Sequence, residues 1–267
     1  MSIEATPASG GPASGGPASG GPGGGGRAAV ITGAANGLGQ EFCVALARRG
    51  VLVAGVDIAD MADTAQAVRH AGGTFLPVTA DVTAESDAAR IAGEVAGAFG
   101  RADICVNNAG TYPLVAFEET SYAEWRRVMT LNLDGMFLVT RALLPLLKQS
   151  PAGRIVNVAS AVVWLGPPRM VAYTTSKGGV IGFTRSLASE LGPAGITVNA
   201  ITPGLIPTAT AVRTGVTADL DRVVAGQAIQ KVQQPADLVT SLLFLCDPGS
   251  GFVTGAAINA DGGFAKH

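Results

Sequence analysis

The sequence AAVITGAANGLG occupies residues 28–39 and decides the fold. Its first five residues form an apolar run typical of a buried strand, and a helical pattern follows over residues 38–49. Gly33, Gly37 and Gly39 lie around the junction. Glycine suits a sharp turn there, because a phosphate can approach the backbone with no Cβ in the way. The N–H groups of the helix N-terminus favour an anion, so we predict a nucleotide-phosphate site.

Apolar runs and helical patterns alternate along the rest of the chain. Strands are predicted at residues 28–32, 51–56, 74–79, 103–107, 154–159, 196–201 and 256–260. Helices are predicted at residues 38–49, 84–99, 122–147, 171–191 and 235–246. Short apolar strands separated by helices indicate a parallel sheet covered on both faces. We therefore expect a single doubly wound, Rossmann-type α/β fold, with its function at the carboxyl ends of the strands.

The domain organisation is simple. Residues 27–267 are predicted to form one Rossmann-type domain, and the irregular region 205–234 is predicted to be a lid over the site. In residues 1–26 the unit Ala-Ser-Gly-Gly-Pro recurs at 8–12, 13–17 and 18–22. Such side chains cannot offset the entropy of ordering, so we expect a disordered Gly/Pro/Ser/Ala tail, which also lacks the features of a secretory signal.

Composition narrows the possible partners. The net charge is −2 with no basic stripe, which argues against nucleic acid, and no apolar run of eighteen residues predicts a membrane span. Charged residues make up 14% of the chain and hydrophobic residues 48%, a balance typical of subunits that bury further surface in an oligomer. Cys43, Cys105 and Cys246 are isolated in apolar segments. We expect them to be buried and reduced in a cytoplasmic protein with no metal in its site.

Asp57 follows the second predicted strand, about twenty residues after the glycines, where a carboxylate accepts hydrogen bonds from the adenosine ribose. The same carboxylate would repel a 2′-phosphate. Asn36 is not a basic residue, and the uncharged Ile58 follows Asp57. These residues favour NAD over NADP as the cofactor.

Tyr173 and Lys177 lie one helical turn apart, and Ser160 ends the fifth predicted strand. The lysine ammonium, together with a positive nicotinamide ring, would favour the phenolate and lower the tyrosine pKa from its usual value near 10. Tyr173 could then move the proton of an alcohol. Ser160 would hold the substrate oxygen. Tyrosine and lysine at this spacing are also common on any amphipathic helix. Similarly, Asn132 could be an ordinary hydrogen-bonded residue of a buried helix.

Several motifs together resemble the single-domain branch of the short-chain dehydrogenase/reductase family, over nearly all of the chain from Arg27. They are the stretch Thr32–Gly39, the pairs Asp81-Val82 and Pro203-Gly204, the run Asn107-Asn108-Ala109-Gly110, and Thr208. Asn132, Ser160, Tyr173 and Lys177 match the catalytic tetrad of the family.

The resemblance implies which residues bind the cofactor NAD: Gly33, Asn36, Gly37, Leu38, Gly39, Asp57, Ile58, Asp81, Val82, Asn108, Ala109, Gly110, Tyr173, Lys177, Pro203, Gly204, Ile206 and Thr208. It also implies that Lys177 reaches the nicotinamide ribose. Asn132 would sit in a helix disturbed by a water that passes protons from Lys177 to solvent.

The stretches GGVIGFTR (residues 178–185) and DGGFAKH (residues 261–267) are similar to family members that oxidise secondary or aryl alcohols with NAD. The resemblance therefore implies an NAD-dependent dehydrogenase of a secondary alcohol, or a reductase of the matching ketone. An alternative is a 3-oxoacyl-thioester reductase, with Arg126, Arg127 and Arg169 receiving a phosphopantetheine or a carrier protein. Such reductases usually have Asn-Tyr at the catalytic tyrosine, whereas this chain has Ala172-Tyr173. A non-catalytic dinucleotide-binding sensor is a third possibility, but it would be expected to lack Tyr173 or Lys177.

The candidate substrate pocket is mostly apolar and comprises Ser160, Tyr112, Val162, Trp164, Leu165, Met170, Leu205 and Ile206. It predicts an uncharged aromatic or alicyclic substrate, although the apolar residues could instead close the subunit core. The helices at 122–147 and 171–191 carry more apolar surface than one side of a sheet can cover. In the family these helices pair across a two-fold axis, which implies a homotetramer with D2 symmetry.

Overall fold

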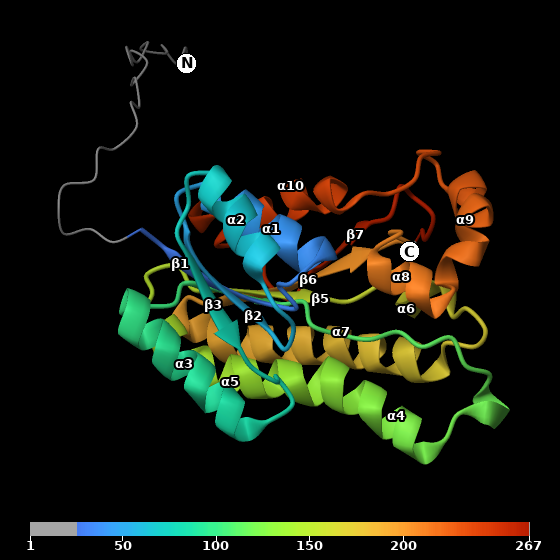
Figure 1. Ribbon diagram of the computed structural model, residues 1–267, viewed down its shortest axis with the longest axis horizontal. Helices are drawn as coiled ribbons and strands as arrows, with labels where there is room; N and C mark the ends of the chain where they lie inside the picture. Colours follow the sequence, from blue (N-terminus) through green and yellow to red (C-terminus); the bar gives the residue numbers. More distant parts are fainter. Residues whose placement is uncertain (1–25, 267) are drawn as a thin grey trace, which may run out of the picture.

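The computed structural model describes residues 26–266, and these form one seven-stranded parallel sheet (Figure 1). The strands are β1 (Ala28–Thr32), β2 (Leu52–Asp57), β3 (Phe75–Thr79), β4 (Ile104–Asn107), β5 (Arg154–Val158), β6 (Thr197–Pro203) and β7 (Ala257–Ala260). Their order is β3-β2-β1-β4-β5-β6-β7. The chain changes direction across the sheet between β1 and β4, which is where such folds bind ligands. The predicted Rossmann-type fold is confirmed.

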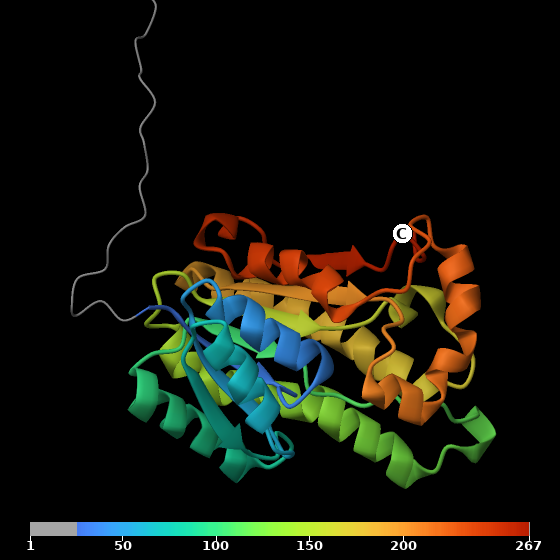
Figure 2. The same ribbon diagram turned by 45° about the horizontal axis from the view of Figure 1, so that its top comes forward.

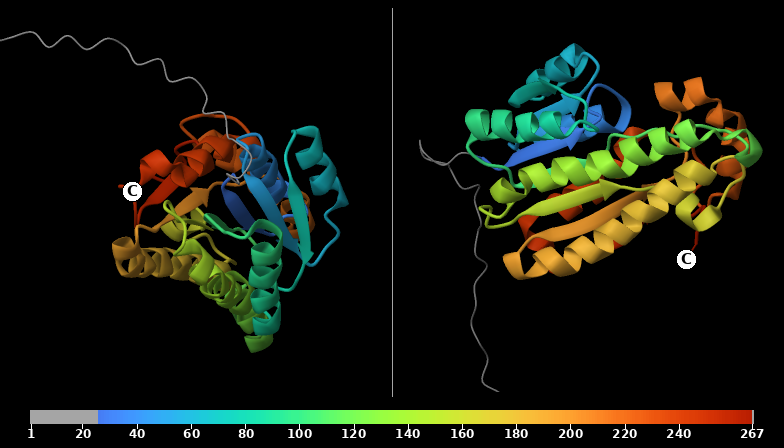
Figure 3. Two further views of the ribbon diagram at one scale, coloured as in Figure 1. Left: turned by 90° about the vertical axis from the view of Figure 1, so that its left-hand side faces the viewer. Right: turned by 90° about the horizontal axis from the view of Figure 1, so that it is seen from below.

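The helices cover both faces of this sheet. They are α1 (Gly37–Ala47), α2 (Ala62–His70), α3 (Glu85–Phe99), α4 (Tyr122–Met129), α5 (Gly135–Leu147), α6 (Val162–Leu165), α7 (Val171–Leu191), α8 (Ala209–Thr214), α9 (Leu220–Gly226) and α10 (Val239–Cys246). Figure 1 shows α1, α2 and α10 above the sheet and α3, α5 and α7 below it. Seen from below, α3 and α5 run side by side (Figure 3).

Two hydrophobic cores lie on the two faces. Successive residues of a strand point to opposite sides, so Val30 packs into one core with Ile91 and Leu143, while Ile31 packs into the other with Phe42. All five side chains are fully buried. This two-sided burial explains why the strands read as continuous apolar runs.

The predicted helix over residues 122–147 is interrupted. After α4, the segment η2 (Thr130–Asp134) forms a π-helical turn, and α5 follows. The whole stretch is long and apolar enough to cross a membrane by length and composition alone. In the fold, Val139, Leu143 and Leu147 are fully buried within the second core.

The sequence did not predict α2, α6, α8 or α9. Helix α2 buries only Thr64 and Val68, too few apolar residues for a clear helical pattern. Residues 205–234, predicted to be irregular, contain α8 and α9 at the carboxyl end of the sheet (Figure 2). The predicted helix over 235–246 begins as the 3₁₀ segment η5 (Pro235–Leu238). The other 3₁₀ segments are η1 (Phe117–Glu119), η3 (Gly192–Ala194), η4 (Val216–Asp219) and η6 (Pro248–Ser250).

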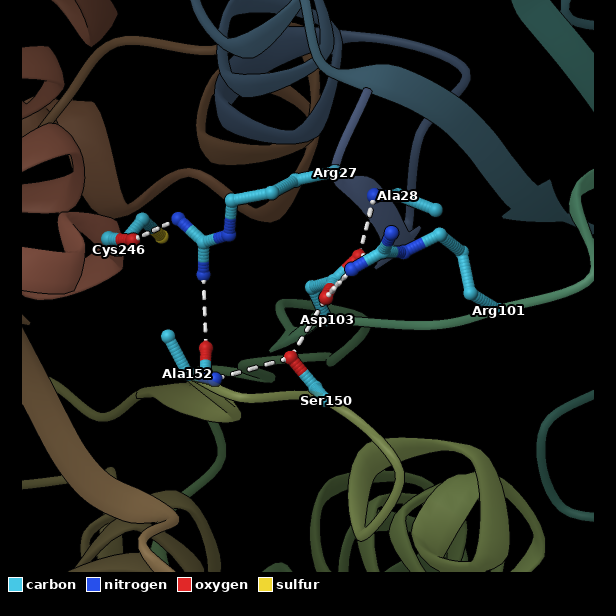
Figure 4. A network of polar contacts seen from close by, with 7 residues as sticks. All are labelled: Arg27, Ala28, Arg101, Asp103, Ser150, Ala152 and Cys246. Carbon is cyan, nitrogen blue, oxygen red and sulfur yellow. Dashed lines mark hydrogen bonds and ion pairs between the residues drawn. The ribbon is translucent and has the colours of Figure 1, made fainter. Parts of the chain in front are cut away.

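A polar network fastens the amino end of the sheet (Figure 4). The buried Asp103, just before β4, accepts hydrogen bonds from the Ala28 N–H (2.8 Å), the Ser150 hydroxyl (2.5 Å) and the Arg101 guanidinium (2.6 and 2.7 Å). Arg27 donates to the carbonyls of Cys246 (2.5 Å) and Ala152 (2.9 Å). These bonds join β1, β4, the turn before β5 and the end of α10. The predicted tail precedes this network and, apart from Gly26, lies outside the described residues.

Candidate active site

A cavity of about 720 Å³ opens at the carboxyl ends of the strands, as the fold predicts. This volume is within the usual range for small-molecule sites. Residues from the ends of β1, β2, β4, β5 and β6 line it, together with residues of α6, α7, α8 and α9. All the site residues that the sequence predicts line the cavity, except Gly39, Asn132 and Trp164. The structure therefore brings the predicted set together.

The glycine-rich turn after β1 forms one wall. Gly33 and Gly37 have φ angles of +68° and +56°, the left-handed region that favours glycine. A Cβ on Gly33 would lie 2.8 Å from the Asn108 amide nitrogen, which donates to the carbonyls of Thr32 and Gly33. A Cβ on Gly39 would lie 1.9 Å from the Gly33 carbonyl oxygen. Gly39 is thus required for packing between helix and turn, and this explains why it does not line the cavity.

Helix α1 points its N-terminus at this wall. Its N-cap residue, Asn36, makes no side-chain capping bond, and its first turn carries no acidic residue. Within the described residues, these backbone N–H groups are therefore uncompensated by a side chain, which leaves them available to an anion. The glycine turn and this helix end fit the phosphates of a dinucleotide.

Asp57 lies at the end of β2, next to the glycine turn, where the adenosine ribose of a dinucleotide would be bound. Its two carboxylate oxygens accept hydrogen bonds from the N–H groups of Ala35 and Ala59, both at 3.0 Å. These bonds fix the carboxylate, and each oxygen keeps a further lone pair for a ligand hydroxyl. Ile58 and Asp81 line the same part of the cavity. The residues present therefore fit a nicotinamide dinucleotide.

Tyr173, Ser160 and Lys177 meet at the centre of the cavity. Tyr173 and Lys177 come from successive turns of α7 and are buried, and Ser160 follows β5. Burial raises the pKa of Tyr173 to about 12, against the opposing effect of Ser160. Burial lowers the pKa of Lys177 to about 8. Both shifts are dominated by desolvation of the protein's own groups. The expectation that Lys177 and the positive nicotinamide ring together lower the tyrosine pKa stays a prediction.

Lys177 is held in a fixed position. Its Nζ donates to the Val158 carbonyl at 2.7 Å and lies 5.8 Å from the centroid of the Tyr173 ring. This carbonyl is the last of β5, two residues before Ser160. The hydrogen bond links α7 to the end of the strand that carries the serine.

Asn132 lies in the π-helical turn η2 and is buried behind the cavity. Its side-chain oxygen accepts from the Thr111 N–H (2.8 Å), and its amide donates to the Thr111 carbonyl and the Ser176 hydroxyl (both 2.9 Å). These bonds join the loop after β4 to α7. Asn132 thus positions the loop that lines the cavity, and the disturbed helix that the resemblance implies lies at this residue.

The substrate side of the cavity is largely apolar. The hydroxyls of Tyr112 and Thr208 are 3.1 Å apart, and the ring centroid of Tyr112 lies 5.6 Å from that of Tyr173. Val162, Leu165, Met170, Leu205 and Ile206 line the same region. Trp164, which the sequence places in this pocket, does not line the cavity. Val162 and Leu165 are three residues apart and share one side of α6, whereas Trp164 lies on another.

The sequence interpretation missed several charged residues of the lining. Arg213, Asp219 and Arg222 come from the region of α8 and α9, and the cavity also includes Arg127 and Arg169. The sequence provided little indication of these lining residues, because arginine and aspartate are also common on solvent-exposed helix faces. Of the three arginines suggested for a carrier, Arg126 is not part of the lining.

Comparison with known proteins identifies the class. Residues 33–265 match the family model described as enoyl-(acyl carrier protein) reductase. The chain is 38% identical to a (2S)-[(R)-hydroxy(phenyl)methyl]succinyl-CoA dehydrogenase subunit of Thauera aromatica, covering 89% of this chain and 96% of that protein. It is 36% identical, with the same coverage of each chain, to the cis-4-hydroxycyclohexanecarboxylate dehydrogenase of Sinomonas cyclohexanicum.

A solved structure agrees with this. A variant of the actinorhodin polyketide ketoreductase with NADPH superposes with a TM-score of 0.86 at 32% identity, covering 91% of this chain and 98% of that one. The fold and the site define an oxidoreductase that uses a nicotinamide dinucleotide to interconvert alcohols and ketones. The chain belongs to the short-chain dehydrogenase/reductase family.

Proposed function

We propose that the chain is an NAD-dependent dehydrogenase of secondary alcohols, or the reductase of the matching ketones. The observation that carries this proposal is the buried Tyr173 in the cavity beside Ser160 and Lys177. A bound nicotinamide dinucleotide supplies the carbon that accepts or returns hydride. The protein supplies the proton transfer and the orientation of the substrate.

The geometry supports a catalytic role for each of these residues. Ser160 holds the substrate oxygen, and Tyr173 exchanges a proton with it. With a pKa of about 12, Tyr173 is a neutral phenol near pH 7, the form that donates a proton to a ketone oxygen. Lys177, mostly charged near pH 7, stabilises negative charge that develops on the phenol oxygen. Asn132 keeps the loop after β4 in place, and a water held at the disturbed helix beside it passes protons from Lys177 towards solvent.

Asp57 supports NAD rather than NADP. Its carboxylate is fixed by two backbone N–H groups and faces the cavity at the end of β2. A ribose with free hydroxyls can donate to it, whereas a 2′-phosphate would meet a like charge. Asn36 and Ile58, which also line this region, offer no cation to compensate a phosphate.

Direct assay tests the proposal. The purified protein is mixed with NAD or NADP and a panel of secondary alcohols, and absorbance of the reduced nicotinamide is followed. We expect turnover with alicyclic or aromatic alcohols and a preference for NAD. Absence of turnover with every alcohol and matching ketone would contradict the dehydrogenase, and would favour a dinucleotide-binding sensor that performs no reaction.

A second candidate function is reduction of a 3-oxoacyl thioester. Arg127 and Arg169 line the cavity, and the matched family model is described by an acyl-carrier substrate. Arg127 is already bonded to Glu124 at 2.7 Å, which weakens this candidate. A kcat/KM for a β-ketoacyl thioester well above that for small ketones would favour it.

Assembly and location complete the proposal. The chain forms a homotetramer in the cytoplasm, where the three buried cysteine thiols stay reduced. Exposed apolar side chains at Tyr122, Phe137 and Val171 lie on the helices expected to pair, and Phe252 lies in the loop before β7. Residues 205–234 act as a lid, because α8 and α9 both contribute to the cavity lining.

A further inference from the structure

Four arginines line the cavity in addition to the catalytic groups: Arg127, Arg169, Arg213 and Arg222. Two of them have carboxylate partners. Arg127 pairs with Glu124 at 2.7 Å, and Arg222 pairs with Asp219 at 3.4 Å. Within residues 26–266, Arg169 and Arg213 have no such ion pair. A predominantly apolar substrate pocket thus carries two arginines that form no ion pair with an acid among the described residues.

Arg169 has a structural task. It is the one non-glycine residue of the described chain with a positive φ, +65°, a conformation that costs free energy. Its carbonyl accepts from the Val115 N–H (2.8 Å) and its guanidinium donates to the Leu114 carbonyl (3.3 Å). Arg169 therefore ties the loop before α7 to the loop after β4.

Arg213 has no comparable task. It lies in the last turn of α8, and its guanidinium makes one long contact, 3.4 Å to the Thr210 hydroxyl, among the described residues. Most of its five N–H donors are therefore left for a ligand.

The position of Arg213 relates it to the reacting atoms. The Tyr112 hydroxyl lies 3.1 Å from the hydroxyl of Thr208, the N-cap residue of the helix α8 that carries Arg213, and Tyr112 and Arg213 line the same cavity. The Tyr112 ring packs against the Tyr173 ring at 5.6 Å. Helix α8, with Arg213 in its last turn, is thus joined through Tyr112 to the catalytic tyrosine on the substrate side of the cavity.

We propose that Arg213 binds a carboxylate of the substrate while the substrate hydroxyl lies at Ser160 and Tyr173. The inference rests on the proposed dehydrogenase function and refines it, since the substrate is then a hydroxy acid rather than an uncharged alcohol. A guanidinium suits a carboxylate because its parallel N–H groups bind both oxygens. The phosphates of the dinucleotide are the other anionic groups that Arg213 could bind. The glycine turn and the N-terminus of α1 already provide a site for these phosphates.

Matched pairs of substrates test this directly. The acids are 3-hydroxybutanoate, 3-hydroxy-3-phenylpropanoate and 4-hydroxycyclohexanecarboxylate, each compared with its uncharged methyl ester. We expect the wild-type kcat/KM to favour the best acid over its ester by about tenfold or more. R213Q should lower kcat/KM for that acid about thirtyfold, mainly through KM, and leave the ester within about twofold.

Two further variants and one binding measurement complete the design. R213K should recover part of the preference for the acid, because it restores the charge without the planar donor pair. R222Q, which removes an arginine already paired with Asp219, should leave that preference unchanged. The Kd for NADH, from fluorescence titration, should be the same for R213Q and the wild type.

Four results would overturn the inference. An ester used as well as its acid by the wild type would show that no carboxylate is recognised. A weaker Kd for NADH in R213Q, with an unchanged acid-to-ester ratio, would assign Arg213 to the cofactor phosphates. Turnover of neutral alcohols but of no hydroxy acid would leave the dehydrogenase intact and refute this refinement, whereas turnover of neither class would refute both.

Discussion

The Lys177 Nζ lies 5.8 Å from the centroid of the Tyr173 ring, and both side chains are buried in the same cavity. Burial has opposite effects on the two groups, since it favours the neutral form of each. It raises the pKa of Tyr173 to about 12 and lowers that of Lys177 to about 8. Near pH 7 the pair is therefore a neutral phenol beside a largely protonated amine.

This relationship predicts the pH dependence of ketone reduction. Because the pKa of Lys177 is lowered to about 8, its ammonium is present below that pH and is lost above it, while Tyr173 stays protonated to about pH 12. We expect kcat/KM for the ketone to be level below pH 8 and to fall above it. A pH profile of wild type and Lys177→Met measures this, and the variant should lack the fall. A wild-type profile level through pH 10 would argue against a role for the Lys177 charge.

Asp57→Ala should weaken NAD binding and relax discrimination against NADP, because a repulsive carboxylate is removed. We expect the ratio of kcat/KM for NAD to that for NADP to fall by about tenfold to a hundredfold. Steady-state kinetics with both cofactors gives the ratio. Asp81→Ala is the matched control, and it should weaken both cofactors alike. A wild type that already prefers NADP would contradict the assigned role of Asp57.

The network around Asp103 predicts a loss of stability on Asp103→Ala. Three neighbours would lose their shared acceptor, so the free energy of unfolding should fall by about 2–4 kcal/mol. Chemical denaturation measures it, with the exposed Glu118→Ala as control. Burial raises the pKa of Asp103, but bonds from Arg101, Ser150 and Ala28 outweigh it and the pKa is lowered. The contribution of Asp103 is therefore complete above its unfolded-state pKa and is lost as pH falls through the folded-state value. An unchanged midpoint in the variant would refute this role.

Light scattering tests the proposed assembly. A homotetramer would have four times the chain mass of 26.7 kDa. Phe252, fully exposed before β7, is the side chain whose burial we expect at a subunit contact, so Phe252→Asp should lower the mass. A monomer mass for the wild type at micromolar concentration would be incompatible with the proposal.

The sequence was sufficient for the fold and for most of the cavity lining. Strand burial on both faces produces continuous apolar runs, and the glycine turn requires residues such as Gly33 that are visible in the sequence. The predicted helix over residues 171–191 matches α7, which carries Tyr173 and Lys177 at the expected spacing.

Other features of the site could not be predicted, because they depend on contacts between residues that are far apart in the sequence. The π-helical turn at Asn132 is bonded to the distant Thr111 and Ser176, and the pKa of Tyr173 depends on burial by many elements. Arg213 lies on the short helix α8, and only folding brings this helix to Tyr112, through the contact between the Thr208 and Tyr112 hydroxyls. The sequence predicts Trp164 in the pocket with Val162 and Leu165, but Trp164 lies on a different side of α6 and does not line the cavity.

The most direct test of the account is the turnover of Tyr173→Phe with NAD and the best secondary alcohol of the panel. The phenylalanine ring fills the same space but cannot exchange a proton, so we expect kcat to fall by about three orders of magnitude or more while the Kd for NADH stays nearly unchanged. A variant that keeps a tenth or more of the wild-type kcat would contradict the assignment of Tyr173 as the proton-transferring residue.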